Sequence, residues 1–235
     1  GLVGSEMCIR DRLLIVAAII LFSWSHIRSY VMTQINERMI EAFQNGESTV
    51  DVNPIEEWIA TNGQQDAPDQ EVVSVDEKED LDGIDHEDPS KHQTDYTEIG
   101  DSMVAFIKVP SVGINEPILK GPATVQNLYN GVVFVEEDDS LDDQNIAIAG
   151  HKLLGTNMRF SNLANANIGA KVIIVTRDGE REFEITNKKH VKPNDVSVLE
   201  EQQGEPTKLT LVTCDDYDPN TGLFLTRTII TAKEA

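Results

Sequence analysis

The sequence predicts an all-β fold, a closed or nearly closed barrel with one or two short helices. Short β-branched runs separated by turn residues begin at Met103 and continue to the C-terminus, and strands spaced in this way are typical of barrels. The expected strands are VAFIKVP (104–110), GVVFV (131–135), NIAIAG (145–150), KVIIVT (171–176), REFEIT (181–186), KLTLVTC (208–214) and LFLTRTIITA (223–232). One helix is expected near Met158 to Ala164. Residues 101–235 therefore form the expected functional domain.

An N-terminal membrane anchor is expected before the barrel. Residues 1–12 do not begin with Met and have no clear period, and we interpret them as non-native sequence. The twelve-residue apolar run LLIVAAIILFSW begins at Leu13, whereas a membrane span needs about 20 residues. We expect residues 13–31 to be an anchor whose upstream end has been lost. A buried helix and a signal peptide cleaved near Ser23 and Ser25 are the alternatives.

A helical stalk is expected over residues 32–63. Apolar residues recur there and just before it at steps of four, which is the period of a helix: Ile27, Val31, Ile35, Met39 and Phe43. A second short helix is expected to open at Asn53 and Pro54 and to stop at Asn62-Gly63. The apolar stripe is core, a pairing surface for a second copy in a homodimer, or a face lying on a membrane, and the sequence does not choose among these.

Residues 64–100 are expected to form an acidic disordered linker. They hold 13 Asp and Glu against Lys78 and Lys91, with Tyr96 as the single aromatic residue. Such a composition buries too little apolar surface to offset chain entropy. An acidic metal-binding arm or an autoinhibitory arm is the alternative. The whole chain has a net charge of −22, which argues against nucleic acid as a partner.

Three residues of the barrel region are candidates for nucleophilic catalysis. Cys214 ends a predicted strand and precedes the polar run DDYD, which favours a thiol at the rim over a buried structural cysteine. His151 follows a strand that ends in Gly150, whereas His190 lies in the run NKKH and is interpreted as a solvated surface residue. Arg227 interrupts an apolar strand, where its guanidinium can stabilise an oxyanion or simply face solvent.

Six motifs together resemble those of class A sortases, the membrane-anchored cysteine transpeptidases of Gram-positive bacteria. They are TLVTC (210–214) with the following DDYD, Arg227 thirteen residues after the cysteine, AGH (149–151), GPAT (121–124), SLDDQNI (140–146) and VKPNDVSVL (191–199). The resemblance covers residues 103–235 and implies a sortase-type barrel. It also implies a single-pass membrane protein with an extracellular catalytic domain.

The resemblance assigns chemistry to the three candidates. It implies that Cys214 is the nucleophile, His151 the general acid and base, and Arg227 the transition-state stabiliser. The implied reaction cleaves an LPxTG-type sorting signal of a surface protein between Thr and Gly, through a thioester, and transfers the protein to an amine of a peptidoglycan precursor. A thiol peptidase that only hydrolyses and a non-catalytic calcium-dependent binding domain are the alternatives.

The resemblance further implies a substrate groove, for which ordinary barrel core is the alternative. Its expected residues are Ala149, Val196, Val198, Leu199, Val212, Thr213 and Phe224. Phe224 departs from the family pattern, since the best-known member has tryptophan there, and an N–H donor is lost.

A calcium site is also expected in the acidic loop. Residues 136–143 hold six carboxylates in eight positions, and crowded carboxylates repel one another unless a cation joins them. A solvated acidic loop is the alternative. The resemblance implies Ca²⁺ as an activator that orders one wall of the groove, with the ligands Glu136, Asp139, Asp143, Asn145 and Glu201. Asp139 is one methylene shorter than the glutamate of that subgroup.

Overall fold

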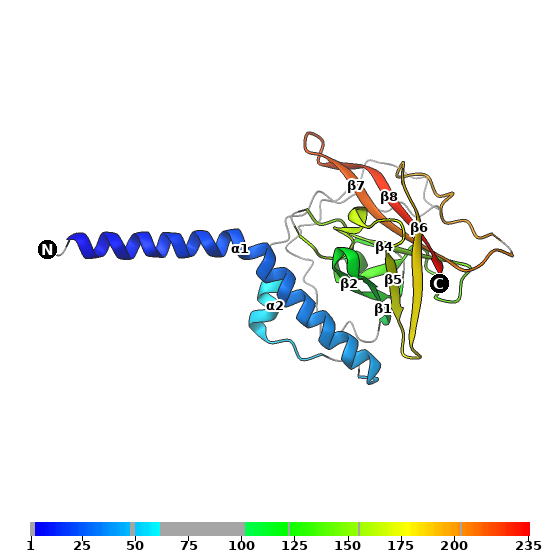
Figure 1. Ribbon diagram of the computed structural model, residues 1–235, viewed down its shortest axis with the longest axis horizontal. Helices are drawn as coiled ribbons and strands as arrows, with labels where there is room; N and C mark the ends of the chain where they lie inside the picture. The colour runs from blue at the N-terminus through cyan, green and yellow to red at the C-terminus, as the bar shows by residue number, and fades with distance from the viewer. Residues whose placement is uncertain (1–2, 48–49, 62–101, 122, 155, 203) are drawn as a thin grey trace.

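A computed structural model describes residues 3–47, 50–61, 102–121, 123–154, 156–202 and 204–235. The expected acidic linker over residues 64–100 lies outside these described residues. The described chain consists of a long helix α1 (Val3–Gln44), a short helix α2 (Pro54–Thr61) and a β-barrel (Figure 1).

The barrel is closed by eight strands, in the order β1-β2-β3-β4-β7-β8-β6-β5, with β5 pairing back to β1. Their bounds are β1 Met103–Val109, β2 Ile114–Leu119, β3 Val132–Phe134, β4 Asn145–Gly150, β5 Lys171–Val175, β6 Glu180–Val191, β7 Lys208–Asp218 and β8 Leu223–Glu234. The predicted closed barrel is therefore confirmed. Seven of its strands overlap the seven runs that the sequence indicates.

Strand β2 is the strand that the sequence did not predict. Its run INEPIL holds Pro117, which lacks an N–H donor and argues against a strand, and Glu116, which is charged. In the structure Pro117 pairs with Phe106 on β1. Glu116 is buried because it finds an arginine partner inside the fold.

The helix predicted near Met158 to Ala164 is wrong. This segment forms turns, an isolated bridge between Lys152 and Arg159, and a 3₁₀ helix over Leu163–Asn165. Arg159 has a left-handed φ of 52°, which breaks a right-handed helix. The short α-helix of this domain is instead α3 (Val125–Asn130), capped by the Thr124 hydroxyl.

The barrel interior is aliphatic and aromatic, as the alternation of the strands requires. Residues of β4, β7 and β8 that face inward are fully buried there: Ile146, Ile148, Leu209, Leu211, Ile230 and Ala232. The alternate residues of these strands face the other side of the sheet, where Ala149 and Val212 adjoin a second cluster.

Helix α1 ends against the barrel and contributes to that second cluster (Figure 1). Ile35, Met39 and Phe43 are buried and belong to the same cluster as Phe106. Asn36 adds a specific contact, since its Nδ2 donates to the carbonyl of Asn115 at 2.5 Å. This part of the apolar stripe is therefore core.

Helix α2 begins at the predicted Pro54, and its first turn is fixed by reciprocal capping. Asn53 Oδ1 accepts from the backbone N–H groups of Ile55 and Glu56, and the Glu56 carboxylate accepts from the Asn53 N–H. Glu56 also pairs with Arg38 of α1 at 2.9 Å.

Over the described residues, no helix combines the length and the apolar character that a membrane span requires.

Candidate active site

The three predicted catalytic residues occupy neighbouring positions in, or directly after, three adjacent strands. Strands β4 and β7 run parallel and pair Gly150 with Thr213, so the residues that follow each of these, His151 and Cys214, lie side by side. On the other side of β7, Cys214 pairs directly with Arg227 of the antiparallel strand β8. The order His151–Cys214–Arg227 is therefore built by strand register.

Cys214 is a buried free thiol. It is 9% exposed. Burial raises the pKa of Cys214 above its ordinary value, and the positive charges of Arg227 and Lys152 oppose that rise without overcoming it. The resting thiol is therefore protonated near neutral pH, and the two cations favour the thiolate when the proton leaves.

His151 is neutral in the resting site. Burial, and then the charge of Arg159, lower the pKa of His151 to about 4. Among the described residues no hydrogen-bond partner reaches its buried Nε2 atom, and its ring lies 4.9 Å from the ring of Tyr129. Gly150 is required before it, because a Cβ there would lie 2.6 Å from the Phe160 ring.

A buried ion pair supports the side of the site behind His151. Arg159 is fully buried and pairs with Glu116, which also accepts from the Arg159 peptide N–H at 2.8 Å. The same guanidinium donates through Nε and Nη2 to the Tyr129 carbonyl at 3.1 and 2.6 Å. Because the Tyr129 ring contacts His151, this pair fixes one wall around the imidazole.

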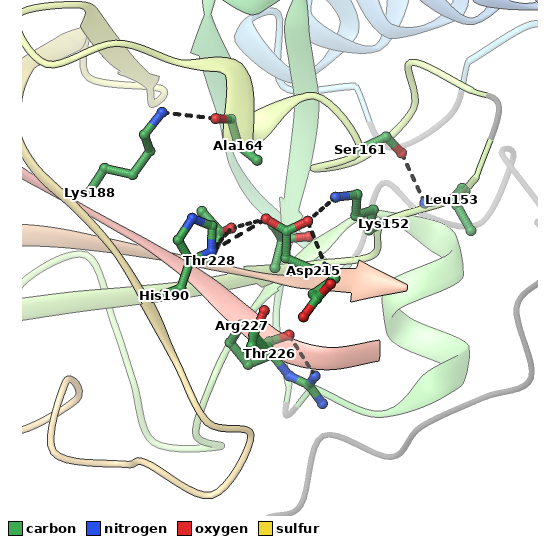
Figure 2. Close-up of polar contacts among 12 residues, drawn as sticks. Lys152, Leu153, Ser161, Ala164, Lys188, His190, Asp215, Thr226, Arg227 and Thr228 are labelled. Atoms are coloured by element: carbon green, nitrogen blue, oxygen red, sulfur yellow. Dashed lines mark hydrogen bonds and ion pairs between the residues drawn. The ribbon is translucent and has the colours of Figure 1, made fainter. Parts of the chain in front are cut away.

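Arg227 is buried but only lightly bonded. It is 6% exposed, and its Nη1 donates to the carbonyl of its neighbour Thr226 at 3.2 Å (Figure 2). Within the described part of the chain this is the one hydrogen bond of its guanidinium. Most of its five donors are therefore available beside the thiol.

A second polar cluster surrounds Asp215, the residue after Cys214. Its Oδ1 pairs with Lys152 Nζ, and its Oδ2 accepts from the Thr228 hydroxyl at 2.5 Å (Figure 2). Burial alone would raise the pKa of Asp215, but the hydrogen bonds from Lys152 and Thr228 outweigh it and leave the pKa below its ordinary value. His190 Nδ1 lies 3.5 Å from Asp215 Oδ2, although the imidazole is 57% exposed as the sequence predicted.

Sequence reasoning assigned no role to Lys152, Asp215 or Thr228. A signal was present, because opposite charges directly follow His151 and Cys214. That signal becomes readable only when β4 and β7 are known to be parallel neighbours.

The sequence model of the sortase domain matches residues 107–235, which include the whole His151–Cys214–Arg227 arrangement. The chain belongs to the sortase family. It is 44% identical over 133 residues to sortase A of Staphylococcus aureus, covering 56% of this chain and 65% of the relative. It is 28% identical over 123 residues to sortase A of Bacillus anthracis, covering 52% and 57%. The class A resemblance is thus confirmed. This chain spans less than two thirds of the length of either relative.

The fold agrees with solved sortase structures. Sortase A of Listeria monocytogenes superposes with a TM-score of 0.51 at 26% identity, covering 57% of this chain and 88% of that chain. Sortase C-1 of Actinomyces oris superposes with a TM-score of 0.50 at 25% identity, covering 59% and 77%. Both likenesses concern a little more than half of the present chain.

The predicted groove residues of this sortase differ in exposure. Ala149, Thr213 and Phe224 are buried. Thr213 donates through its hydroxyl to the Gly150 carbonyl at 2.8 Å, and Phe224 packs against Tyr217 with ring centroids 5.3 Å apart. The more accessible members of the set are Val196, Val198, Leu199 and Val212. Contact between substrate and this set remains a prediction.

The predicted calcium ligands are only partly brought together. Glu136 and Asp139 join Asp138 in a group whose carboxylate oxygens lie within 4.8 Å of one another. Burial and the neighbouring carboxylates Glu136, Asp143 and Asp138 raise the pKa of Asp139 to about 6. Such crowding is what a divalent cation relieves.

The other three predicted ligands make bonds within the protein. Asp143 accepts from the backbone N–H and the hydroxyl of Ser140. Asn145 Oδ1 accepts from Thr210 at 2.6 Å, while its Nδ2 donates to the carbonyls of Val198 and Leu199. Glu201 accepts from the Gln144 N–H at 3.1 Å, which ties its loop to the acidic loop.

A hollow of about 810 Å³ lies elsewhere on the barrel, beside the end of α1 and the β5–β6 turn. Phe43, Lys120, Arg177 and Asp178 are among its lining residues. None of the three predicted catalytic residues lines it.

Proposed function

We propose that this chain is a cysteine transpeptidase that cleaves a sorting signal of the LPxTG type between Thr and Gly and transfers the acyl group to an amine. One observation carries the proposal: strand register places a thiol between an imidazole and a buried, lightly bonded guanidinium. A nucleophile, a proton carrier and an oxyanion donor are the parts that acyl transfer needs.

The reaction starts from a neutral thiol and a neutral imidazole. His151 takes the proton of Cys214 as the sulfur attacks the Thr carbonyl carbon, and a carbon–sulfur bond forms. Arg227 donates to the oxyanion of the tetrahedral intermediate. When the carbon–nitrogen bond breaks, His151 returns the proton to the leaving glycine amine, and the acyl group remains on Cys214 as a thioester.

In the second half of the reaction, the acceptor amine replaces the sulfur of Cys214 on the acyl group. His151 takes a proton from the amine as the amine attacks the thioester, the carbon–sulfur bond breaks, and His151 returns the proton to the departing Cys214 thiolate. Closing of the site around the bound signal would expel water, which favours attack by an amine over hydrolysis. An amino group of a peptidoglycan precursor is the proposed acceptor.

The groove proposed for the Leu-Pro part of the signal consists of the predicted set from Ala149 to Phe224. Val212 lies two residues before Cys214 on β7 and faces the same side of the sheet. Val198 and Leu199 are attached through Asn145 to the start of β4, at the opposite end of that strand from His151. Val212, next to the thiol, would contact the apolar part of the signal beside the scissile bond.

We also propose that the enzyme is membrane-anchored, with its catalytic domain outside the cell. The apolar run over residues 13–24 supports this proposal, since it lies within α1. Carbonate extraction of membranes from expressing cells tests it. An anchored protein stays in the pellet, and a protein without an anchor is released.

Ca²⁺ is proposed as an activator, held by Glu136, Asp139, Asp143, Asn145 and Glu201. The bound ion would neutralise crowded carboxylates and join the loop of Glu201 to the acidic loop. Asp139→Asn should then remove the calcium response of the turnover, while Glu184→Gln, an exposed carboxylate on β6, should keep it. An equal response in both variants would contradict this assignment.

The test of the proposed function uses the full chain in detergent, an LPxTG peptide and triglycine, followed by mass spectrometry. Transfer to triglycine that disappears in Cys214→Ala is the expected result. Cleavage without capture of the amine would instead indicate a hydrolase. A folded chain that neither cleaves nor transfers would contradict the proposal.

A further inference from the structure

The residues that directly follow the three catalytic residues are joined to one another through one carboxylate. Lys152 follows His151, Asp215 follows Cys214 and Thr228 follows Arg227. Asp215 pairs with Lys152 through Oδ1 and accepts from Thr228 through Oδ2 at 2.5 Å (Figure 2). The strands β4, β7 and β8 are thereby joined next to the catalytic positions by side chains as well as by their backbones.

This contact lies on the opposite face of the sheet from the thiol. Side chains alternate along a strand, so Asp215 faces away from the side of Cys214, and Thr228 faces away from the side of Arg227. Thr228 is fully buried and faces the same way as Ile230 of the barrel interior. The carboxylate can therefore act on the chemistry through the positions of its neighbours and not by touching substrate.

The pair is well shielded from solvent. The side chains of Lys152 and Asp215 are 21% and 16% exposed, whereas the pair of Lys171 and Glu182 on β5 and β6 is 65% and 46% exposed. Partial burial strengthens a pair that is complete and makes the loss of one member costly. Lys171–Glu182 is thus a matched ion pair at the surface.

We propose that Asp215 is a positioning residue of the transpeptidase, and that Lys152 and Thr228 hold it so that His151, Cys214 and Arg227 keep their relative places. This inference rests on the proposed function. An error of about 1 Å in such an arrangement costs roughly a hundredfold in rate. Loss of either member of the pair should therefore reduce turnover.

A purely electrostatic role predicts a different outcome. The charge of Lys152 lowers the pKa of Cys214, and the charge of Asp215 raises it. If charge alone mattered, Lys152→Met would slow the enzyme and Asp215→Asn would accelerate it. If position matters, both variants are slow, although their thiol pKa values move in opposite directions.

The experiment measures kcat and KM for peptide transfer with the full chain, together with the rate of Cys214 alkylation by iodoacetamide as a function of pH. For Asp215→Asn and Lys152→Met we expect kcat to fall about tenfold to a hundredfold and KM to stay within about twofold. Lys152→Arg, which preserves the ion pair, should stay within about threefold of the parent. The alkylation profile should shift to higher pH in Lys152→Met and to lower pH in Asp215→Asn.

Lys171→Met serves as the control and should change none of these quantities. A kcat for Asp215→Asn equal to or above the parent value would overturn the proposal, as would losses that only follow the folded fraction measured by circular dichroism. A parent chain that alkylates at Cys214 but transfers no peptide would instead refute the proposed function. Alkylation needs no peptide, so the two failures are distinguishable.

Discussion

Two buried arginines of this sortase are held in different ways. Arg159 is completely enclosed, pairs with Glu116 and donates twice to the Tyr129 carbonyl. Arg227 is almost as buried, yet its guanidinium makes one hydrogen bond among the described residues, to the carbonyl beside it. Arg159 is therefore satisfied by the fold, whereas Arg227 keeps donors for a ligand.

The difference in hydrogen bonding indicates that the charge of Arg159 serves the fold, whereas the charge of Arg227 is available to a ligand. Burying a charge without partners is costly, so a fold retains such a charge mainly where function requires it. The thiol and the imidazole are both neutral in the resting site, because desolvation raises the pKa of Cys214 and lowers that of His151. Arg159 and Glu116, behind His151, are paired with each other, whereas the described residues give Arg227 no carboxylate partner.

The largest expected effect is on stability and concerns Arg159. Arg159→Met leaves the Glu116 carboxylate buried without its partner, and the free energy of unfolding should fall by about 3–5 kcal/mol. Urea denaturation measures this free energy of unfolding. The double variant Glu116→Gln with Arg159→Met should recover part of the loss, because no unpaired charge remains. Equal losses in the single and double variants would contradict the account.

Arg227→Met should instead affect turnover. Removing an oxyanion donor lowers kcat by about 10²- to 10³-fold, while the free energy of unfolding should change by less than about 1 kcal/mol, because few intramolecular bonds are lost. Steady-state transfer and urea denaturation of the same preparation separate the two quantities. A variant that is strongly destabilised would show that Arg227 is structural.

The stability of the fold should decrease in acid because of His151. The pKa of His151 is about 4 when folded, below the ordinary value of about 6.5, so the unfolded chain takes up this proton first. Stability is unaffected above pH 6.5, falls as the pH drops toward 4, and loses at most about 3 kcal/mol by then. The difference between the parent and His151→Asn across this range isolates the effect from that of the carboxylates. Parallel pH profiles would contradict the assigned pKa.

The smallest effect concerns the contact between α1 and the barrel. Asn36→Ala removes the hydrogen bond to the Asn115 carbonyl and should reduce the free energy of unfolding by about 1–2 kcal/mol. Thr33→Ala, one turn away on an exposed position of α1, is the matched control. Thermal unfolding that is identical in both would show that the helix does not depend on this contact.

Local patterns predicted most strands, and they failed where a distant partner decides the conformation. The pattern of the run INEPIL does not predict a strand, because it does not show that Glu116 pairs with Arg159, which lies 43 positions later. Arg159 itself has a left-handed φ, which is incompatible with the predicted helix near Met158. Both errors therefore involve one buried ion pair, Glu116–Arg159, which no local pattern indicates.

For the candidate site, the sequence predicted the individual residues but not the contacts around them. Each candidate catalytic residue lies in, or directly after, a strand that the sequence marks, and the family motifs include all three. The cluster around Asp215 could not be predicted, because it depends on which strands are neighbours. The neutral states of Cys214 and His151 depend on burial, which only the folded chain provides.

The most direct test of the central claim is the intact mass of the full chain after brief mixing with an LPxTG peptide and no acceptor amine. The account predicts an acyl adduct with the mass of the peptide up to Thr, located on Cys214 after digestion and released when triglycine is added. An adduct on another residue, or a chain that alkylates at Cys214 yet never gains the acyl mass during turnover, would contradict it.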